Sequence, residues 1–280
     1  MDHTSGLAPI TAHRHGTGGP QVAVLHGGPG APGTGCSLAR SLADRCTVIE
    51  PHQRRGGDVP LTVQQHVADH AAVLPARATV LGWSWGAMLG LSYAAEHPDR
   101  VTSLILVGCG TYDQASRSLY QRRLAQRLGR TGTARIDELS RRRTAATSEA
   151  ERDRLLAELG QLADRAQHVD PLPEPDVGLR FDGTGHGQTW ADVLHRQASG
   201  QEPAAFRAIT CPVLMLHGHD DPHPGPAIRD TLQAFIPQLH YVEFAACGHK
   251  PWLERQARQP FGEALARWIG VETRQPPAAR

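Results

Sequence analysis

The 280-residue chain lacks the sequence features of proteins that bind nucleic acids or membranes. Its formal net charge is +1, so no basic surplus draws it to phosphate backbones or to anionic lipids. No apolar stretch approaches the roughly 20 residues that a membrane-spanning helix needs. Residues 1–19 also lack the basic and continuously apolar regions of a secretory signal. The sequence therefore predicts a cytoplasmic protein with no nucleic-acid partner and no membrane partner.

Cysteine is scarce, and its spacing argues against two kinds of site. The five cysteines form no Cys-x-x-Cys pair, which disfavours both a disulfide framework and a zinc site. They stand at Cys36, Cys46, Cys109, Cys211 and Cys247. A chain of this length can bury one large core without such a staple. The pattern predicts a reducing compartment and no metal site.

Short apolar runs alternate with helical patterns along most of the chain, which predicts parallel βαβ units and an α/β fold with a mostly parallel sheet. The predicted strands cover residues 21–25, 47–49, 79–81, 101–107, 213–216 and 241–244. The predicted helices include residues 62–74, 85–97 and 258–269, where apolar positions follow a period near 3.6.

The alternation stops between about Tyr112 and Ala208. Residues 116–160 form an arginine-rich helical stretch whose alternating charges are typical of a solvated helix face. Prolines at 171–175 and glycines at 183–187 then indicate a loop region, before a short helix near residues 190–198. We therefore predict a helical cap at residues 112–208, inserted between the two parts of the core at 1–111 and 209–272. Residues 273–280 are predicted to be a frayed tail.

One pentapeptide carries the strongest chemical signal. The sequence Gly-Trp-Ser-Trp-Gly at 82–86 lies between a predicted strand and a predicted helix, which is the context of a nucleophile elbow. Side chains at Gly82 and Gly86 would collide with neighbouring backbone in so tight a turn, and Ser84 would adopt a strained, exposed conformation. The alternative is a glycine-rich turn with a serine helix cap. The elbow predicts Ser84 as a nucleophile that attacks a carbonyl carbon.

A serine nucleophile needs a base and an acid, and both occur after later predicted strands. His249 follows the strand at 241–244, and Asp220 and Asp221 follow the strand at 213–216. The chain order serine, acid, histidine is that of an α/β-hydrolase triad. We predict Asp221 as the acid, since its spacing from the preceding glycine is usual in such loops, with Asp220 as the alternative. His249 could otherwise be a surface histidine in a turn.

A glycine-rich loop after the first predicted strand fits an oxyanion hole. Gly27 and Gly28 have no Cβ to obstruct a close approach, and the spacing matches neither a dinucleotide-binding loop nor a Walker loop. We predict the backbone N–H groups of Gly28 and Trp85 as the oxyanion donors. Gly27 and Trp83 are predicted to bind substrate, with core packing as the alternative for Trp83.

Two groups of histidines have a spacing that metal ligands can use. His66 and His70 lie four residues apart on one face of a predicted helix, but the glutamate of a metalloprotease helix is absent. His217, His219 and His223 surround the predicted acid. We predict a structural role for both groups.

Three of these motifs together carry a family resemblance. His26-Gly27-Gly28-Pro29-Gly30, the elbow at 82–86 and Gly248-His249 resemble the α/β-hydrolase superfamily and, within it, the proline iminopeptidase-like group. The resemblance covers residues 20–110 and 208–270. It implies a serine hydrolase with the triad named above, a helical cap and no cofactor. Members of that group cleave an N-terminal proline or another small residue from a short peptide, and relatives hydrolyse esters, amides or lactones.

The chain departs from that group at two places. His52-Gln53-Arg54-Arg55 stands where the group usually has Asp-Gln-Arg-Gly. The group also binds the substrate amine with acidic residues carried partly by a Trp-Glu pair in the cap, and this chain has no such pair. The remaining candidates for binding an amine are carboxylates that are more often solvated, namely Glu174, Asp176 and Glu202.

We therefore predict a serine hydrolase that acts through an acyl-enzyme on a small amide or short peptide. The alternatives are a carboxylic-ester or lactone hydrolase and an acyl-transfer enzyme of specialised metabolism. A further alternative is a binding protein that keeps the fold without catalysis.

Overall fold

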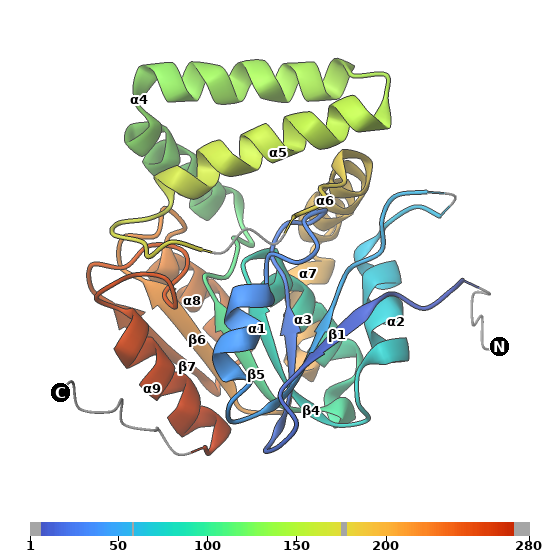
Figure 1. Ribbon diagram of the computed structural model, residues 1–280, viewed down its shortest axis with the longest axis vertical. Helices are drawn as coiled ribbons and strands as arrows, with labels where there is room; N and C mark the ends of the chain where they lie inside the picture. Colours follow the sequence, from blue (N-terminus) through green and yellow to red (C-terminus); the bar gives the residue numbers. More distant parts are fainter. Residues whose placement is uncertain (1–6, 58, 175–177, 272–280) are drawn as a thin grey trace.

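The computed structural model describes residues 7–57, 59–174 and 178–271 (Figure 1). Within them, seven strands form one sheet in the order β1-β3-β2-β4-β5-β6-β7. The strands are β1 Ala12–His15, β2 Gln21–Leu25, β3 Thr47–Pro51, β4 Ala78–Trp83, β5 Val101–Val107, β6 Val213–Gly218 and β7 Leu239–Phe244. Strands β2 to β7 run parallel, and β1 pairs antiparallel with β3 at the edge. The predicted α/β fold with a mostly parallel sheet is confirmed.

Helices cover both faces of this sheet (Figure 1). The α-helices are α1 Cys36–Leu42, α2 Val63–Val73, α3 Trp85–Glu96, α4 Gln114–Ala145, α5 Glu149–Ala166, α6 Gly183–Ala198, α7 Gln201–Ala204, α8 Gly225–Gln233 and α9 Arg258–Ile269. Two short 3-10 helices, η1 Pro98–Arg100 and η2 Ala205–Ala208, precede β5 and β6. Side chains of α1 and α9 pack on one face, and those of α2, α3 and α8 pack on the other. Every described helix is too short or too polar to traverse a lipid bilayer.

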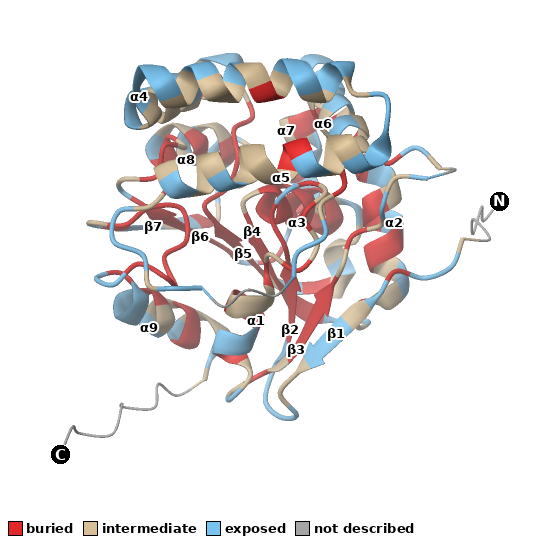
Figure 2. Cartoon of the chain, turned by 45° about the horizontal axis from the view of Figure 1, so that its top comes forward, coloured by how far each residue is buried: buried red, intermediate tan, exposed pale blue. Residues whose placement is uncertain are grey.

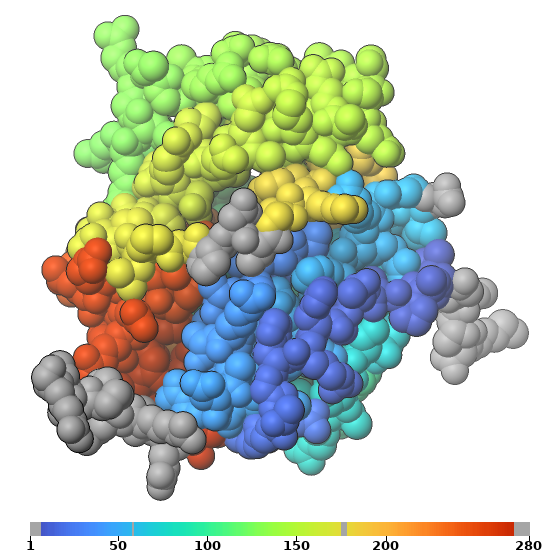
Figure 3. Space-filling model, viewed as in Figure 1, coloured from blue at the N-terminus to red at the C-terminus, as the bar shows by residue number. Residues whose placement is uncertain are grey.

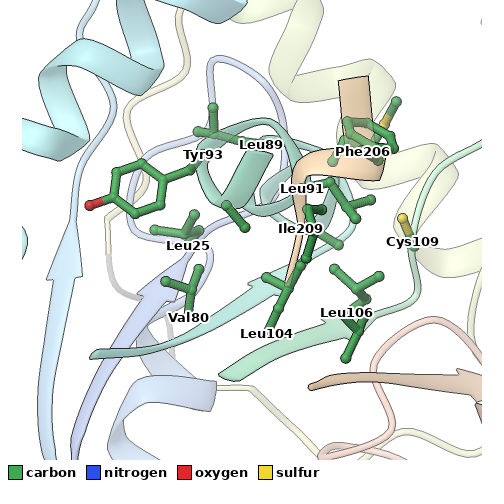
Figure 4. Close-up of a cluster of buried hydrophobic side chains, with 14 of the residues drawn as sticks. Leu25, Val80, Leu89, Leu91, Tyr93, Leu104, Leu106, Cys109, Phe206 and Ile209 are labelled. Carbon is green, nitrogen blue, oxygen red and sulfur yellow. The ribbon is translucent and has the colours of Figure 1, made fainter. Parts of the chain in front are cut away.

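The central strands β2 to β6 are mostly buried on both faces, because apolar side chains project from both sides of the sheet. In β5, Leu104 and Leu106 join the core under α3, whereas Ile105 and Val107 join the core under α1 and α9. Figure 4 shows the first of these cores, in which Tyr93 and Phe206 also pack. Figure 2 shows the buried residues concentrated in the strands and in α3. This double burial fixes the ends of the central strands, from which the functional loops project.

The structure corrects two predictions of secondary structure. Strand β1 was not predicted, because its sequence Ala-His-Arg-His has no apolar run and it lies at the sheet edge. Helix α6 begins at Gly183, in a segment predicted as a loop. The Asp182 side chain caps it by accepting from the Gly185 N–H at 2.8 Å. A Cβ at Gly183 would lie 2.5 Å from the Arg152 carbonyl oxygen, so glycine lets α6 approach α5 there.

Helices α4, α5 and α6, here called the helical insertion, lie between β5 and β6 in the sequence. Figure 3 shows α4 and α5, in green to yellow, lying across one end of the molecule, and their outward faces are largely exposed (Figure 2). Helix α4 is broken at Gly129, where φ is 65° and ψ is −178°. This combination is essentially restricted to glycine. The break lets the second half of α4 turn and pack against α5 (Figure 1).

The predicted domain limits at 111/112 and 208/209 fall in the connections that lead into and out of this insertion, and the division into core and cap stays a prediction. The predicted frayed tail at 273–280 lies outside the described residues, as does Asp176.

Candidate active site

Ser84 lies in the turn between β4 and α3, with φ 57° and ψ −120°. A positive φ is strained for a residue with a Cβ and is held here by the surrounding backbone. A Cβ on Gly82 would collide with the Gly86 carbonyl, and a Cβ on Gly86 would collide with the Leu25 carbonyl. The Ser84 N–H donates to the Val107 carbonyl oxygen at 2.8 Å. The turn therefore has the tightness that the sequence predicted, with Ser84 half-buried.

The Ser84 side chain opens into a cavity of about 520 Å³ between the sheet and the helical insertion, here called the serine cavity. Its hydroxyl makes no hydrogen bond with any described residue. The lining comes from the loops that follow strands β2 and β4 to β7 and from helices α3 to α6. It includes Gly28, Trp85, Met88, Tyr120, Arg143, Leu156, Trp190, His223 and Lys250. The hydroxyl is thus free to meet a bound carbonyl group.

The structure brings His249 and Asp221 together from the loops after β7 and β6. Their Nδ1 and Oδ2 atoms lie 2.6 Å apart, and the two side chains are only 3% and 0% exposed. Neighbouring parallel strands end at the same sheet edge, which is why these distant residues meet. The backbone of Asp220 makes other contacts. Its N–H donates to the Cys247 carbonyl oxygen at 2.9 Å, and its own carbonyl oxygen accepts from Arg127. Of the two candidate acids, Asp221 is the one in contact with the histidine.

Asp221 is ionised, and His249 is neutral, because of where they lie. Burial alone would raise the pKa of Asp221, but the histidines His249, His223 and His217 hold that pKa well below its usual value. Burial lowers the pKa of His249 to about 4, although Asp221 opposes the shift. A neutral imidazole beside a fixed carboxylate is the state in which a histidine accepts a proton.

A second histidine, His223, supports this pair, and sequence reasoning gave it only a structural role. Its backbone N–H donates to Asp221 Oδ1 at 2.9 Å, and its Nδ1 lies 2.8 Å from the same oxygen. Its ring stacks on His249 at 4.6 Å between centroids and on Tyr120 at 4.1 Å. Both oxygens of Asp221 are thereby engaged. The Asp-x-His spacing at 221–223 was the available signal.

Gly108 also shapes the site, and the sequence analysis missed it. It follows β5 with φ 53°, and a Cβ there would lie 2.8 Å from His249 Nδ1. The imidazole therefore occupies space that only a glycine leaves open. Its place at the end of a buried strand was the signal, since the other site residues follow strands in the same way.

Gly28 and Trp85 flank Ser84 on the wall of the serine cavity. Trp85 is the first residue of α3, where backbone N–H groups have no partner within the helix. The Gly28 N–H makes no hydrogen bond with any described residue, and its φ of 125° requires glycine. Gln53 accepts from the Trp85 indole N–H at 2.9 Å. Two unpaired N–H donors thus lie beside the nucleophile.

Gly27 and Trp83, predicted to bind substrate, do not line the serine cavity. Trp83 is 7% exposed, donates from its indole N–H to the His249 carbonyl oxygen at 3.1 Å and packs against Trp252. A Cβ on Gly27 would lie 2.6 Å from the Trp83 ring. The structure therefore favours the packing alternative for Trp83, and Gly27 makes room for that ring.

The carboxylates among the described residues of the serine cavity are already engaged in ion pairs. Lys250 Nζ lies 2.8 Å from Glu174 and 2.9 Å from Asp164. Glu202, another candidate for binding an amine, does not line the cavity and instead pairs with Arg196 at 3.0 Å. Among the described residues, no carboxylate at the cavity remains free for a substrate amine.

Arg143 of α4 is the opposite case. It lines the serine cavity, and among the described residues it has no ion-pair partner. Its Nε atom is buried without a hydrogen bond, and burial lowers the pKa of the guanidinium. An arginine remains charged under such conditions. Among the described residues, Arg143 is therefore a cation of the cavity without a counter-ion.

The loop that carries His249 is tied to the segment after α5. The His249 N–H donates to the Gln167 carbonyl oxygen at 2.9 Å, and the Gly248 N–H donates to Glu254 at 3.1 Å. His168 Nδ1 lies 3.0 Å from the same carboxylate. Burial would lower the pKa of His168, but hydrogen bonds to Asp164 and Glu254 raise it to about 9. A charged contact thus holds the position of the histidine loop.

The His66–His70 pair is not arranged as a metal site. His66 Nε2 hydrogen-bonds Thr189 at 2.9 Å, and His70 Nδ1 hydrogen-bonds the His66 carbonyl oxygen at 2.7 Å. Burial lowers their pKa values to about 3 and about 4. Asp221, His223 and His249 come close enough to hold an ion, but their facing atoms already bond one another.

Comparisons with known proteins agree with the α/β fold described above. A family model described as alpha/beta hydrolase fold matches residues 64–256. The chain is 26% identical over 251 residues to a pimeloyl-[acyl-carrier protein] methyl ester esterase of Nitrosomonas europaea, covering 84% of this chain and 90% of that one. It is 28% identical over 204 residues to a proline iminopeptidase of Lactobacillus delbrueckii subsp. bulgaricus, covering 68% and 64%. The crystal structure of VinJ superposes with a TM-score of 0.64 at 20% identity, covering 92% and 94%.

Proposed function

The chain belongs to the alpha/beta hydrolase fold family and is a serine hydrolase, and on that premise we propose that it cleaves carboxylic esters whose acyl part carries a negative charge. The observation that supports the ester over the peptide is the charge of the serine cavity. Its carboxylates Glu174 and Asp164 are both paired with Lys250, whereas Arg143 has no partner among the described residues.

In the proposed reaction, Ser84 attacks the ester carbonyl carbon while His249 Nε2 takes the hydroxyl proton. Asp221 keeps the other ring nitrogen protonated and stabilises the imidazolium that forms. The Gly28 and Trp85 N–H groups bind the oxyanion, and removal of one such donor costs about 3 kcal/mol in measured cases. His249 then protonates the leaving alcohol, and an acyl-enzyme remains.

Water completes the cycle by the same route. His249 takes a proton from water, the hydroxide attacks the acyl carbon, and the Ser84 oxygen leaves with the proton from His249. The free acid is released. No step needs a cofactor, which is what the sequence also predicts.

A peptide substrate is the second candidate, because the proline iminopeptidase relative and the prediction from sequence both favour it. Recognition of an N-terminal amine would require a free carboxylate. Turnover of proline p-nitroanilide and of p-nitrophenyl hexanoate should be compared in the wild type, with Ser84→Ala as the control. We expect turnover of the ester and little or none of the anilide. Faster cleavage of the anilide would contradict the ester proposal.

The role of Arg143 is tested with two esters of equal length. The p-nitrophenyl half-ester of adipic acid carries a terminal carboxylate, and p-nitrophenyl hexanoate does not. Arg143→Gln should raise KM for the half-ester about 10- to 100-fold, since a hydrogen bond to a charged group contributes about 1.5–3 kcal/mol. KM for the hexanoate should change little.

Arg142→Gln is the matched control for this test. Arg142 is the neighbouring residue of α4, and it pairs with Glu138 on the exposed side, 3.6 Å away. Equal losses on both esters, or equal losses in both variants, would refute a charge-reading role for Arg143. A fluorophosphonate that labels the wild type but not Ser84→Ala would exclude a non-catalytic binding protein.

A further inference from the structure

A second cavity, of about 630 Å³, lies at the β1 edge of the sheet and shares none of the proposed catalytic residues. We call it the edge cavity. It is lined by β1, β3, the start of α1 and residues 178–180. The side chains that could ligate a metal are His13, His15, Cys36, Glu50 and His52, and the cavity is also lined by Arg40, Arg54, Arg55 and Arg180. Nothing in the proposed hydrolysis uses this group.

Several of these side chains converge on one carboxylate. His15 Nε2 lies 3.0 Å from Glu50 Oε2, and His52 Nε2 lies 3.6 Å from Glu50 Oε1. The ligand atoms of His15, Cys36 and Glu50 all lie within 4.8 Å of one another. In a tetrahedral zinc site, ligand atoms are roughly 3.3–3.8 Å apart, since the bonds are about 2.0–2.3 Å long. The group is thus close to the size of a filled metal site.

Glu50 has a buried oxygen without a hydrogen bond to any described residue. Its side chain is 1% exposed, and its Oε1 atom has no hydrogen-bond partner among the described residues. A buried carboxylate oxygen without a partner is costly. A buried carboxylate oxygen without a hydrogen-bond partner, next to an imidazole and a thiol, is suited to binding a cation.

We propose that the edge cavity binds a zinc ion through His15, Cys36, Glu50 and His52. Two imidazole nitrogens, one thiolate and one carboxylate oxygen are ligands that Zn²⁺ accepts in four-coordinate sites. Three of the four already lie within one small sphere, and a rotation of the half-exposed His52 ring supplies the fourth. Calcium and magnesium prefer oxygen ligands and fit this group less well.

The site also accounts for two features of the sequence that hydrolysis leaves unexplained. Strand β1 is too polar to be held by apolar burial, and His13 and His15 alternate on it, so both face the cavity. His52 stands where the resembled group has aspartate. A zinc ion would join β1, β3 and the first residue of α1. The role is therefore structural, in fastening an edge strand that contributes only the partly buried Ala12 to the core.

Tag-free wild-type protein should be titrated with Co²⁺ as a spectroscopic probe and then with Zn²⁺. We expect one equivalent of Co²⁺ to give the intense visible bands of a tetrahedral site together with a thiolate charge-transfer band. Zn²⁺ should displace it. Zinc should also raise the midpoint of thermal unfolding by mass action.

Cys36→Ser should abolish the charge-transfer band, and Glu50→Gln should weaken binding by at least about 100-fold, with circular dichroism showing that both variants are folded. His195→Ala, on the exposed face of α6, and His223→Gln, at the serine cavity, are the controls and should keep the spectrum. Absence of a thiolate band in the wild type would overturn the proposal. Loss of binding in His223→Gln alone would also overturn it, since the ion would then lie at the serine cavity.

Discussion

The molecule holds two buried carboxylates surrounded by histidines, and they differ in one respect. Asp221 has both oxygens engaged, Oδ1 by His223 and Oδ2 by His249. Glu50 has one oxygen hydrogen-bonded to His15, whereas the other has no hydrogen-bond partner among the described residues and only the His52 ring at 3.6 Å. A carboxylate whose two oxygens both accept hydrogen bonds from neighbouring residues can hold a histidine in place during proton transfer. A carboxylate with one oxygen left without a hydrogen bond is suited to binding a cation. The number of satisfied oxygens, and not residue type, separates the two clusters.

The largest expected effect breaks the Asp221 cluster alone. Asp221→Asn should lower kcat/KM for the preferred ester about 10⁴-fold, because the amide stabilises the wrong tautomer of His249. Its Co²⁺ spectrum should stay that of the wild type. Asp220→Asn is the matched control and should retain activity, since its side chain does not contact His249. Equal losses in the two variants would mean that the acid had been misassigned.

A smaller effect is expected from Gly108→Ala. The new Cβ would lie 2.8 Å from His249 Nδ1, so the ring or the backbone must move. A displacement of about 1 Å at a catalytic group costs on the order of 100-fold in rate. Gly262→Ala in α9, where a Cβ meets open space, is the control for glycine replacement in general. A lower steady-state kcat in Gly108→Ala, together with unchanged metal binding, would localise the effect to the triad.

Acidification should also separate the two clusters. Because the pKa of His249 is lowered to about 4, kcat/KM should stay level between about pH 5 and 7 and fall about tenfold per pH unit below about 4. Zinc affinity should decline from the start of the acid titration, since protons compete for every ligand. The check is a pH–rate profile measured beside a metal-binding isotherm at each pH. Parallel declines would contradict the assignment.

The smallest effect concerns the loop that holds His249. The folded pKa of His168 is raised to about 9, so its contribution to stability is complete below about pH 6.5 and is lost as the pH rises through 9. On the order of 2–3 kcal/mol is at stake. The midpoint of thermal unfolding should fall more above pH 9 in the wild type than in His168→Gln. Identical alkaline profiles would remove this role for His168.

Sequence alone went furthest where a motif is local. The elbow at 82–86 and the strand-end positions of Asp221 and His249 follow from short-range patterns, because strand ends in a parallel sheet converge at one edge. His223 and Gly108 act through contacts across that edge, and no spacing rule describes them. The edge cluster draws on positions 15, 36, 50 and 52, so a search for paired cysteines finds nothing there. Strand β1 was not predicted because its composition is not that of a strand; it is part of the sheet through its pairing with β3.

The break in α4 has a consequence for how this protein tolerates change. A straight helix of 32 residues would extend about 48 Å. Gly129 prevents this, yet a Cβ built on it meets no atom within 4 Å. A survey of packing would rate the position as free to vary, although every substitution there imposes a backbone conformation that only glycine adopts readily. The helical insertion that lines the serine cavity therefore depends on a glycine at which an added side chain would contact nothing, so a list of side-chain contacts would not reveal the cost of replacing it.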